Sequence, residues 1–154
     1  MSKIDGGSLE WHGQEFFLLA TRGTVTGMKK AAIYTQGVAR KMIGGTGSGR
    51  TYRRGKSGKV HTASAPGQPP ARDTGILTSS VSYDVKVKGP VVTGRIGPDV
   101  DKIKGRAKTS DPEYGLYLEL GTRNMKRRPW LVPSVIKATP RIIRILRKAV
   151  GGLI

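Results

Sequence analysis

The sequence YLELGTRNMKRRPWLVPS, residues 117–134, decides how this chain folds. A helix-forming segment with one glutamate ends at a Gly-Thr pair, a basic cluster follows, and Trp130 then stands between Pro129 and Pro133. Glycine commonly ends a helix, and proline is favoured at the first position of the next one. The stretch therefore predicts a corner: Gly121 ends one helix, an extended segment follows, and Pro133 starts the last helix.

We expect this corner to be a folding device and not an active site. A residue before proline favours extended backbone, so Arg128-Pro129 should lead the chain straight to Trp130. Trp130 and Leu131 are then predicted to plug an apolar site beneath a sheet. Glu119 is expected to pair with Arg128 or a neighbour across the corner.

Composition limits the class of protein. The 154 residues suit a single domain, 1–154, with a modest core, because apolar residues make up 36% and aromatic residues 6%. The absence of cysteine excludes disulfides and thiolate metal sites. The N-terminal segment lacks the apolar core of a signal peptide. No apolar run approaches the roughly 20 residues that span a bilayer.

Positive charge is concentrated in two blocks of the chain. The formal net charge is +18, and no acidic residue lies between Phe16 and Arg72 or after Glu119. Such a field attracts nucleic acid, acidic protein surfaces or anionic lipid, but it does not choose among them.

Apolar periodicity predicts an α+β fold with a long N-terminal helix, a small antiparallel sheet with a long basic β-hairpin, and a C-terminal helix packed on the sheet. We expect the long helix over 14–42, although Gly23, Gly27 and Gly37 each weaken it by about 1 kcal/mol relative to alanine. The basic region 43–72 is expected to hold the hairpin and an extended, proline-rich segment.

Residues 73–97 should hold a short helix, which Asp73 can cap, and two strands joined by a Gly89-Pro90 turn. Pro140 should kink the last helix or start it afresh. The remaining segments are predicted in order as a loop over 98–112, a helix and the corner over 113–133, and the C-terminal helix over 134–154.

Phosphate-binding and metal-binding motifs are weak. Residues 44–51 nearly match a phosphate loop, but Arg50 replaces its lysine and a predicted helix precedes it. His12 and His61 have no carboxylate at ligand spacing, so each is expected to be a surface histidine. The pair of aspartates in GPDVDK lacks the further oxygen donors of a calcium loop.

A hydrolase motif is also absent from the sequence. Ser64 lies near His61, but the next acidic residue is Asp73 and no nucleophile elbow is present. We therefore expect no enzymatic activity, no catalytic or metal-binding residues, and no cofactor.

The basic cluster GRTYRRGKSGKVH is the strongest candidate for a contact surface. Arginine binds phosphates with two hydrogen bonds, and Tyr52 can stack on a base. The alternative is a solvated charged face. The residues predicted to contact DNA or a partner protein are Arg50, Tyr52, Arg53, Arg54, Lys56 and Lys59.

The last helix carries basic residues on one face, and such a face can lie on a membrane. The helix has no aromatic anchor of its own, which favours packing on its own domain. No membrane partner is expected.

The corner resembles a motif of the tail-completion, or head–tail joining, proteins of tailed bacteriophages, also called minor tail protein Z-type morphogenesis proteins. That pattern is a helix with aromatic residues and a glutamate, then Gly-Thr, a basic bridge, Arg-Pro-aromatic and a second proline. The matching residues here are Tyr114, Tyr117, Glu119, Gly121, Thr122, Arg128, Pro129, Trp130 and Pro133.

A second block, SAPGQPPARDTGILTSSVSY at 64–83, resembles the same family, with the Pro-Pro pair and the Asp-Thr-Gly-x-Leu turn in the same order. The resemblance extends from the first helix into the last. Two positions depart from the family: Trp130 stands where phenylalanine is more usual, and Ile76 stands where arginine is common.

The resemblance implies a structural protein of the virion that completes the tail and joins it to the head. Such proteins sit in the neck, or connector, as homo-oligomeric rings, hexameric by analogy with tail symmetry, and are assembled in the host cytoplasm. The implied partners are other copies of the chain, neck and connector proteins, tail-tube or tail-terminator proteins, and exiting DNA. A basic nucleic-acid-binding protein is the alternative, with the hairpin and the last helix as its contact surface.

Overall fold

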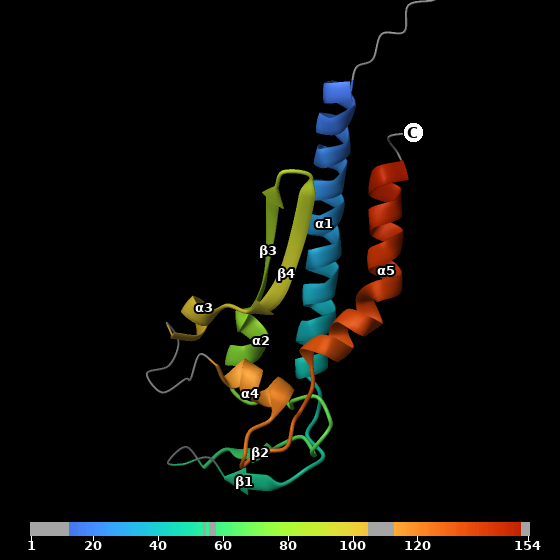
Figure 1. Cartoon of the computed structure of the whole chain (residues 1–154). Helices are drawn as coiled ribbons and strands as arrows, with labels where there is room; N and C mark the ends of the chain where they lie inside the picture. The colour runs from blue at the N-terminus through green and yellow to red at the C-terminus, as the bar shows by residue number, and fades with distance from the viewer. Residues whose placement is uncertain (1–12, 54, 56–57, 105–112, 152–154) are drawn as a thin grey trace, which may run out of the picture.

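The computed structural model describes residues 13–53, 55, 58–104 and 113–151. Two helices dominate it: α1 spans Gly13–Ile43 and α5 spans Leu131–Gly151. Helix α1 runs through the middle of the molecule, with a β-hairpin on one side and α5 on the other (Figure 1). The chain is α+β, and the long helix predicted over 14–42 is confirmed to within one residue at each end.

The α1–α5 contact explains one of the glycines inside α1. Gly27 is buried, and a Cβ at this position would lie 2.6 Å from the Cβ of Ala149. The two helices can approach this closely only where one of them has no side chain. The helical cost of Gly27 is therefore offset by close packing between the helices.

Helix α5 continues through Pro140 and changes direction along its length (Figure 1). Proline lacks the amide hydrogen that the helix needs, and its ring displaces the carbonyl group of the preceding turn. Of the two outcomes expected at Pro140, the structure has the kink and not a new helix.

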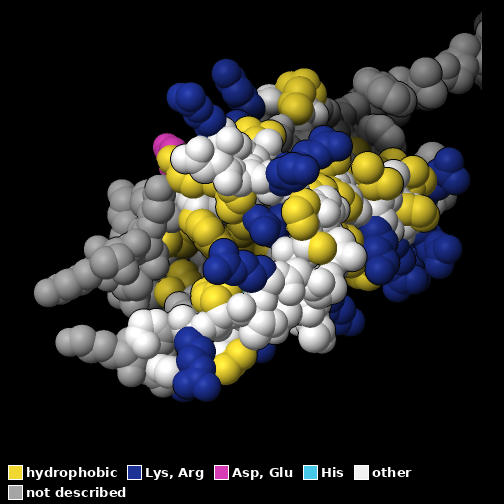
Figure 2. All heavy atoms as spheres, turned by 90° about the horizontal axis from the view of Figure 1, so that it is seen from below, with side chains coloured by type: hydrophobic (Ala, Val, Ile, Leu, Met, Phe, Trp, Pro, Cys, Tyr) yellow, Lys and Arg dark blue, Asp and Glu magenta, His cyan; other side chains and the backbone are white. Residues whose placement is uncertain are grey.

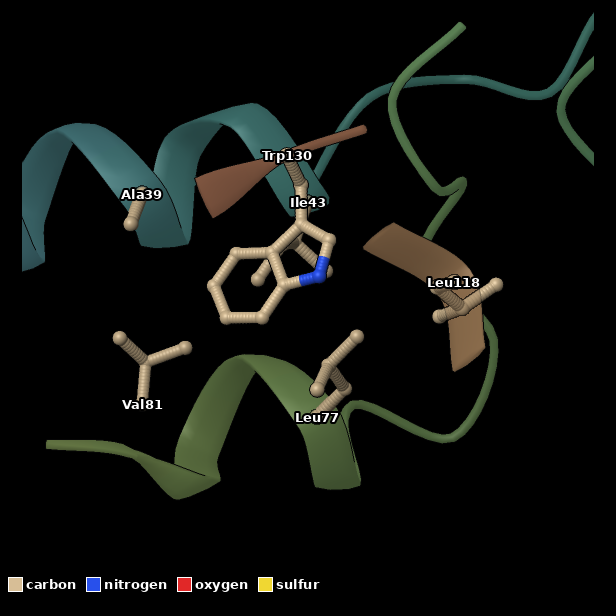
Figure 3. Packing of buried hydrophobic residues seen from close by; sticks show 6 residues of the cluster. All are labelled: Ala39, Ile43, Leu77, Val81, Leu118 and Trp130. Atoms are coloured by element: carbon tan, nitrogen blue, oxygen red, sulfur yellow. The ribbon is translucent and has the colours of Figure 1, made fainter. Parts of the chain in front are cut away.

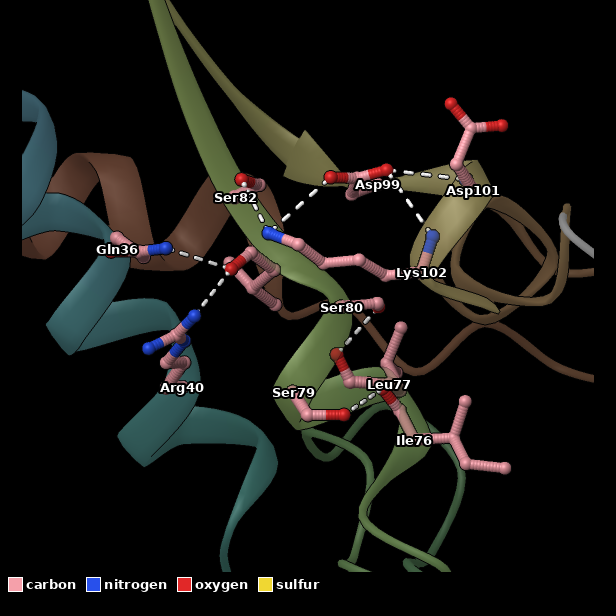
Figure 4. Close-up of polar contacts among 11 residues, drawn as sticks. Gln36, Arg40, Ile76, Leu77, Ser79, Ser80, Ser82, Asp99, Asp101 and Lys102 are labelled. Atoms are coloured by element: carbon pink, nitrogen blue, oxygen red, sulfur yellow. Dashed lines mark hydrogen bonds and ion pairs between the residues drawn. The ribbon is translucent and has the colours of Figure 1, made fainter. Parts of the chain in front are cut away.

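The larger sheet is an antiparallel pair, β3 (Val81–Lys88) and β4 (Val91–Pro98). Val81 pairs with Pro98 at one end and Lys88 with Val91 at the other, so Gly89-Pro90 forms the predicted two-residue turn. Gly89 has a φ of 56°, which glycine adopts without strain. The start of β3 is tied to α1, since the carbonyl oxygen of Val81 accepts hydrogen bonds from Gln36 and Arg40 (Figure 4).

The smaller sheet is the basic hairpin, formed by β1 (Thr51–Arg53) and β2 (Val60–Thr62). These strands pair only with each other and lie at the end of the molecule where α1 ends (Figure 1). The hairpin was expected within 43–72, and its paired strands cover three residues each.

Three short helices close the fold: α2 (Ile76–Ser80), α3 (Val100–Lys104) and α4 (Tyr114–Leu120). The prediction of a loop over 98–112 is wrong for its first part, because α3 lies there. The rest of that predicted loop, residues 105–112, lies outside the described residues. The carboxylate of Asp99 explains α3, since it accepts hydrogen bonds from the amides of Asp101 and Lys102 (Figure 4). The hydrogen bond from the Lys102 amide is the main cause that lowers the pKa of Asp99.

Two predicted helix starts need correction. Asp73 does not cap α2; the cap position is Gly75, at φ 77°, and the Ile76 amide is 3.3 Å from the hydroxyl of Thr74. The last helix begins at Leu131, so Pro133 is its third residue and not its first. The C-terminal helix was predicted to begin at residue 134, after its actual start, because the amides of its first turn are satisfied by an acceptor outside the helix.

The core lies where α1, α2, α4 and the start of β3 meet. Trp130 is its largest fully buried side chain, with 1% of its surface exposed. Figure 3 shows the indole ring enclosed by the other members of the cluster, which are Ala39, Ile43, Leu77, Val81 and Leu118. Ile96 of β4 and Leu131 of α5 pack against the same cluster, so the C-terminal helix meets the sheet here.

Candidate functional site

The corner between α4 and α5 is held by backbone hydrogen bonds. Gly121 ends α4 with a φ of 80°, and Thr122 and Met125 then pair across a tight turn. The Arg128 amide donates to the carbonyl oxygen of Leu118 at 2.6 Å, which folds the basic bridge back onto α4. The chain thereby arrives at Trp130 with its direction fixed.

Glu119 caps the last helix. Its Oε2 atom accepts hydrogen bonds from the amides of Trp130 at 2.6 Å and Leu131 at 2.8 Å, and its Oε1 atom accepts one from Val132 at 3.0 Å. The first amides of a helix have no partner within it, and they attract negative charge. One carboxylate from α4 therefore satisfies the whole first turn of α5.

Of the two partners expected for Glu119, the structure has neighbours across the corner, the amides of residues 130–132, and not Arg128. Both carboxylate oxygens of Glu119 are turned to the α5 amides, and Arg128 donates from its Nε atom to the carbonyl oxygen of Ser64 at 3.1 Å. Arg128 thus ties the corner to the segment that follows β2.

Trp130 is fixed by one polar contact as well as by packing. Its Nε1 atom donates to the carbonyl oxygen of Gly115 at 3.0 Å. A Cβ at Gly115 would lie 3.0 Å from the Cδ1 atom of Leu77 and 3.1 Å from Pro98, so α4 packs tightly there. The Tyr117 hydroxyl donates to Glu113 within α4 at 2.7 Å. These contacts stabilise the fold, as the sequence predicted for the corner.

Gly121→Ala is expected to destabilise the protein by about 2 kcal/mol, because the backbone conformation at Gly121 is nearly exclusive to glycine. A Cβ there would also lie 2.9 Å from the Arg127 amide nitrogen and 3.0 Å from the Met125 carbonyl oxygen. Urea unfolding followed by circular dichroism measures the loss. Gly37→Ala is the control, since it meets nothing within 4 Å inside α1 and should stabilise by up to about 1 kcal/mol. Equal effects of the two variants would contradict this account.

A groove lies between the basic hairpin and α4, with a volume of about 550 Å³. The hairpin, the proline-rich segment and the corner all contribute to its walls. The lining residues are Arg50, Tyr52, His61, Ala63, Ser64, Pro70, Ala71, Asp73, Tyr114, Leu118, Met125 and Arg128. Both cationic and apolar side chains therefore face one hollow.

The groove is lined by His61, Ser64 and Asp73, three polar residues that are not adjacent in the sequence. The Nδ1 atom of His61 lies 3.6 Å from a carboxylate oxygen of Asp73, and the His61 ring stands edge-on to Tyr52 at 5.4 Å between centroids. His61 is thus mostly buried, which corrects its prediction as a surface histidine. The hydroxyl of Ser64 is buried and has no hydrogen-bond partner among the described residues.

Ser64, His61 and Asp73 are the residue types of a hydrolase site, but they do not make the contacts that such a site requires. A serine nucleophile needs a base within hydrogen-bond distance. Ser64 makes no such bond to His61 in the part of the chain that the structure describes. The arrangement offers a hydroxyl, an imidazole and two arginines for binding a ligand.

Tyr114, the first aromatic residue of the corner motif, also lines the groove. Burial raises the pKa of its hydroxyl, and Tyr52 and Asp73 raise it further. The hydroxyl therefore remains a neutral donor at physiological pH.

Two of the predicted contact residues line the groove and two do not. Arg50 and Tyr52 line the groove, whereas Arg53 and Lys59 are exposed and do not line it. Arg54 and Lys56 lie outside the described residues. Seen from this end of the molecule, lysine and arginine side chains are spread over the surface with few acidic ones between them (Figure 2).

The sequence analysis missed a second surface, the exposed apolar face of α1 and α5. Two hollows of about 480 and 400 Å³ lie along this helix pair, the second also reaching β4. The exposed apolar residues are Leu18, Leu19, Ile33 and Tyr34 on α1, and Val132, Val135, Ile136, Ile143 and Val150 on α5. Apolar periodicity did not show that these residues remain exposed.

Comparisons with protein-family models, with curated proteins and with solved structures each gave no match. Across the described residues, no helix is both long and apolar enough to cross a membrane. No group of three or more potential metal ligands occurs within the same residues.

Proposed function

We propose that this protein is a structural component of a tailed-bacteriophage virion, which completes the tail and joins it to the head as a ring in the neck. The resemblance of the corner motif to head–tail joining proteins motivates this proposal. The role of that motif in packing and capping supports it, because Glu119, Gly121 and Trp130 all serve the fold.

The exposed apolar face of α1 and α5 carries the proposal. Ile136 is 66% exposed and Leu18 is 57% exposed, at opposite ends of a surface along the helix pair. Several large, exposed apolar side chains on one helix pair are typical of proteins that assemble. A ring needs a heterologous interface that closes on itself, and this face would supply one side of it.

The positive charge fits the same setting. A net charge of +18 favours acidic neighbours in an assembly and exiting DNA. We expect the neck and tail-tube or tail-terminator proteins to be those neighbours. Localisation in the virion follows from this proposal and is tested with it.

The test is electron microscopy of lysates from a phage that lacks the gene. We expect filled heads to accumulate apart from full-length tails, and the wild-type gene supplied in trans to restore joined particles. Ile136→Glu should fail to restore them, because it places a charge in the apolar interface. Val91→Glu is the matched control: it changes a similarly exposed apolar residue on the β3–β4 hairpin and should restore joining.

Normal joined particles without the gene would overturn this proposal. The second candidate, a nucleic-acid-binding protein, rests on the exposed Arg53, Lys59 and Tyr52 of the hairpin. The nucleic-acid-binding function would gain support if joined particles form without the gene and if the affinity of the protein for DNA falls steeply with salt.

A further inference from the structure

The groove between the hairpin and α4 presents side chains of defined chemistry from one face of the hairpin. Arg50, directly before β1, and Tyr52 in β1 both line the groove. His61 is paired with Tyr52 across the hairpin and shares that face. Arg53 belongs to the opposite face.

The far wall of the groove is rigid. Arg128 is held by its bond to the Ser64 carbonyl oxygen, which leaves the outer edge of its guanidinium group to bind a ligand. A Cβ at Gly49 would lie 2.8 Å from the same oxygen, so the backbone around Ser64 is closely packed. Leu118 and Met125 add an apolar surface beside Arg128.

Ser64 gives a second, independent indication of a ligand. Ser64 is one of the lining residues of the groove, only 4% of it is exposed, and its buried hydroxyl has no hydrogen-bond partner among the described residues. A buried hydroxyl without a partner is costly to the fold. A ligand acceptor in the groove would satisfy it.

We propose that this groove binds an acidic peptide segment of a partner protein. Its carboxylates bind Arg50 and Arg128, one of them accepts the hydroxyl hydrogen of Ser64, and an apolar side chain packs on Leu118 and Met125. Arginine recognises carboxylates through paired hydrogen bonds. This inference does not depend on the place of the protein in a virion.

The lining of the groove favours a peptide over a nucleic acid. The apolar wall formed by Leu118 and Met125 can accept an apolar peptide side chain between the two arginines, which a phosphate backbone does not provide. The apolar wall fits a leucine or tyrosine side chain. A second copy of this chain is a poor source, since it has 10 acidic residues and none between Phe16 and Arg72.

The test is fluorescence anisotropy with a labelled peptide of about eight residues that alternates glutamate with leucine and tyrosine, a length suited to a groove of this size. We expect a dissociation constant of about 10 to 100 µM for the full chain. The same peptide with glutamine in place of glutamate should bind at least about tenfold more weakly, because arginine then loses its charged partners.

Two pairs of variants separate a built site from general attraction. Arg50→Ala should weaken binding by about tenfold, whereas Arg53→Ala, on the other face of the hairpin, should change it less than about twofold. Ser64→Ala should weaken binding by about tenfold while leaving the urea midpoint unchanged or higher, because it removes an unpartnered hydroxyl.

Three results would overturn the proposal. Equal losses for Arg50→Ala and Arg53→Ala would show diffuse attraction to a basic surface. Tighter binding of oligothymidylate than of the peptide would identify a nucleic-acid site instead. Absence of peptide binding by a chain that remains folded by circular dichroism would remove the site altogether.

Discussion

Trp130→Ala is expected to lower the free energy of unfolding by about 4 kcal/mol. The indole ring is 1% exposed and contacts residues from α1, α2, α4 and β3. Its removal leaves a cavity where these elements meet and leaves the Gly115 carbonyl oxygen without its donor. A loss of this size is a large fraction of the roughly 5 to 15 kcal/mol that stabilises a domain.

Urea unfolding measured by far-ultraviolet circular dichroism gives the loss without reliance on the two tryptophans of the chain. Trp130→Phe is the graded comparison, because it keeps an aromatic ring and loses the Nε1 hydrogen bond. We expect it to cost about 2 kcal/mol, roughly half as much. A loss below about 1 kcal/mol for Trp130→Ala would show that the core lies elsewhere.

The elements with strong local patterns were predictable. The long helix, the β3–β4 pair and the corner around Gly121 follow from periodicity and from residues that end helices. The burial of Trp130 was predicted as well, because a large aromatic side chain at a corner between two helices is expected to pack against the core. Here local preference and tertiary packing agree.

The missed features depend on contacts between distant residues. Glu119 caps amides that lie 11 to 13 residues further along the chain, and His61 meets Asp73 12 residues away. No spacing rule for a helix or a strand relates such residues. One signal was present: Leu131 starts a helix without a serine, threonine, aspartate or asparagine before it, so an acceptor had to come from elsewhere.

The exposed face of α1 and α5 shows a second limit of sequence analysis. Apolar periodicity indicates that a helix has an apolar face, but it does not say whether the chain itself covers that face. Ile136 and Ile33 are apolar residues of these two helices, and both are exposed. Only the arrangement of the elements distinguishes a core from an interface.

Glu119→Ala is expected to lower the free energy of unfolding by about 3 kcal/mol, since it removes the acceptor of three amides at the start of α5. Glu119→Gln keeps the shape and one carbonyl acceptor, so it should cost about half as much. Glu113→Ala is the control on the same segment. Its carboxylate accepts a hydrogen bond from the Tyr117 hydroxyl at an exposed position, and its loss should cost less than about 1 kcal/mol.

Hydrogen exchange distinguishes this loss from that of Trp130→Ala. Glu119→Ala should increase exchange first at the amides of Trp130, Leu131 and Val132, because the first turn of α5 loses its cap while the core remains packed. Trp130→Ala should instead increase exchange in α1, α2 and α4 together. Uniform exchange in Glu119→Ala would mean that the carboxylate supports the core as a whole. The distinction matters for the proposed assembly, because the first turn of α5 carries Val132 and adjoins Val135 and Ile136, which are also exposed.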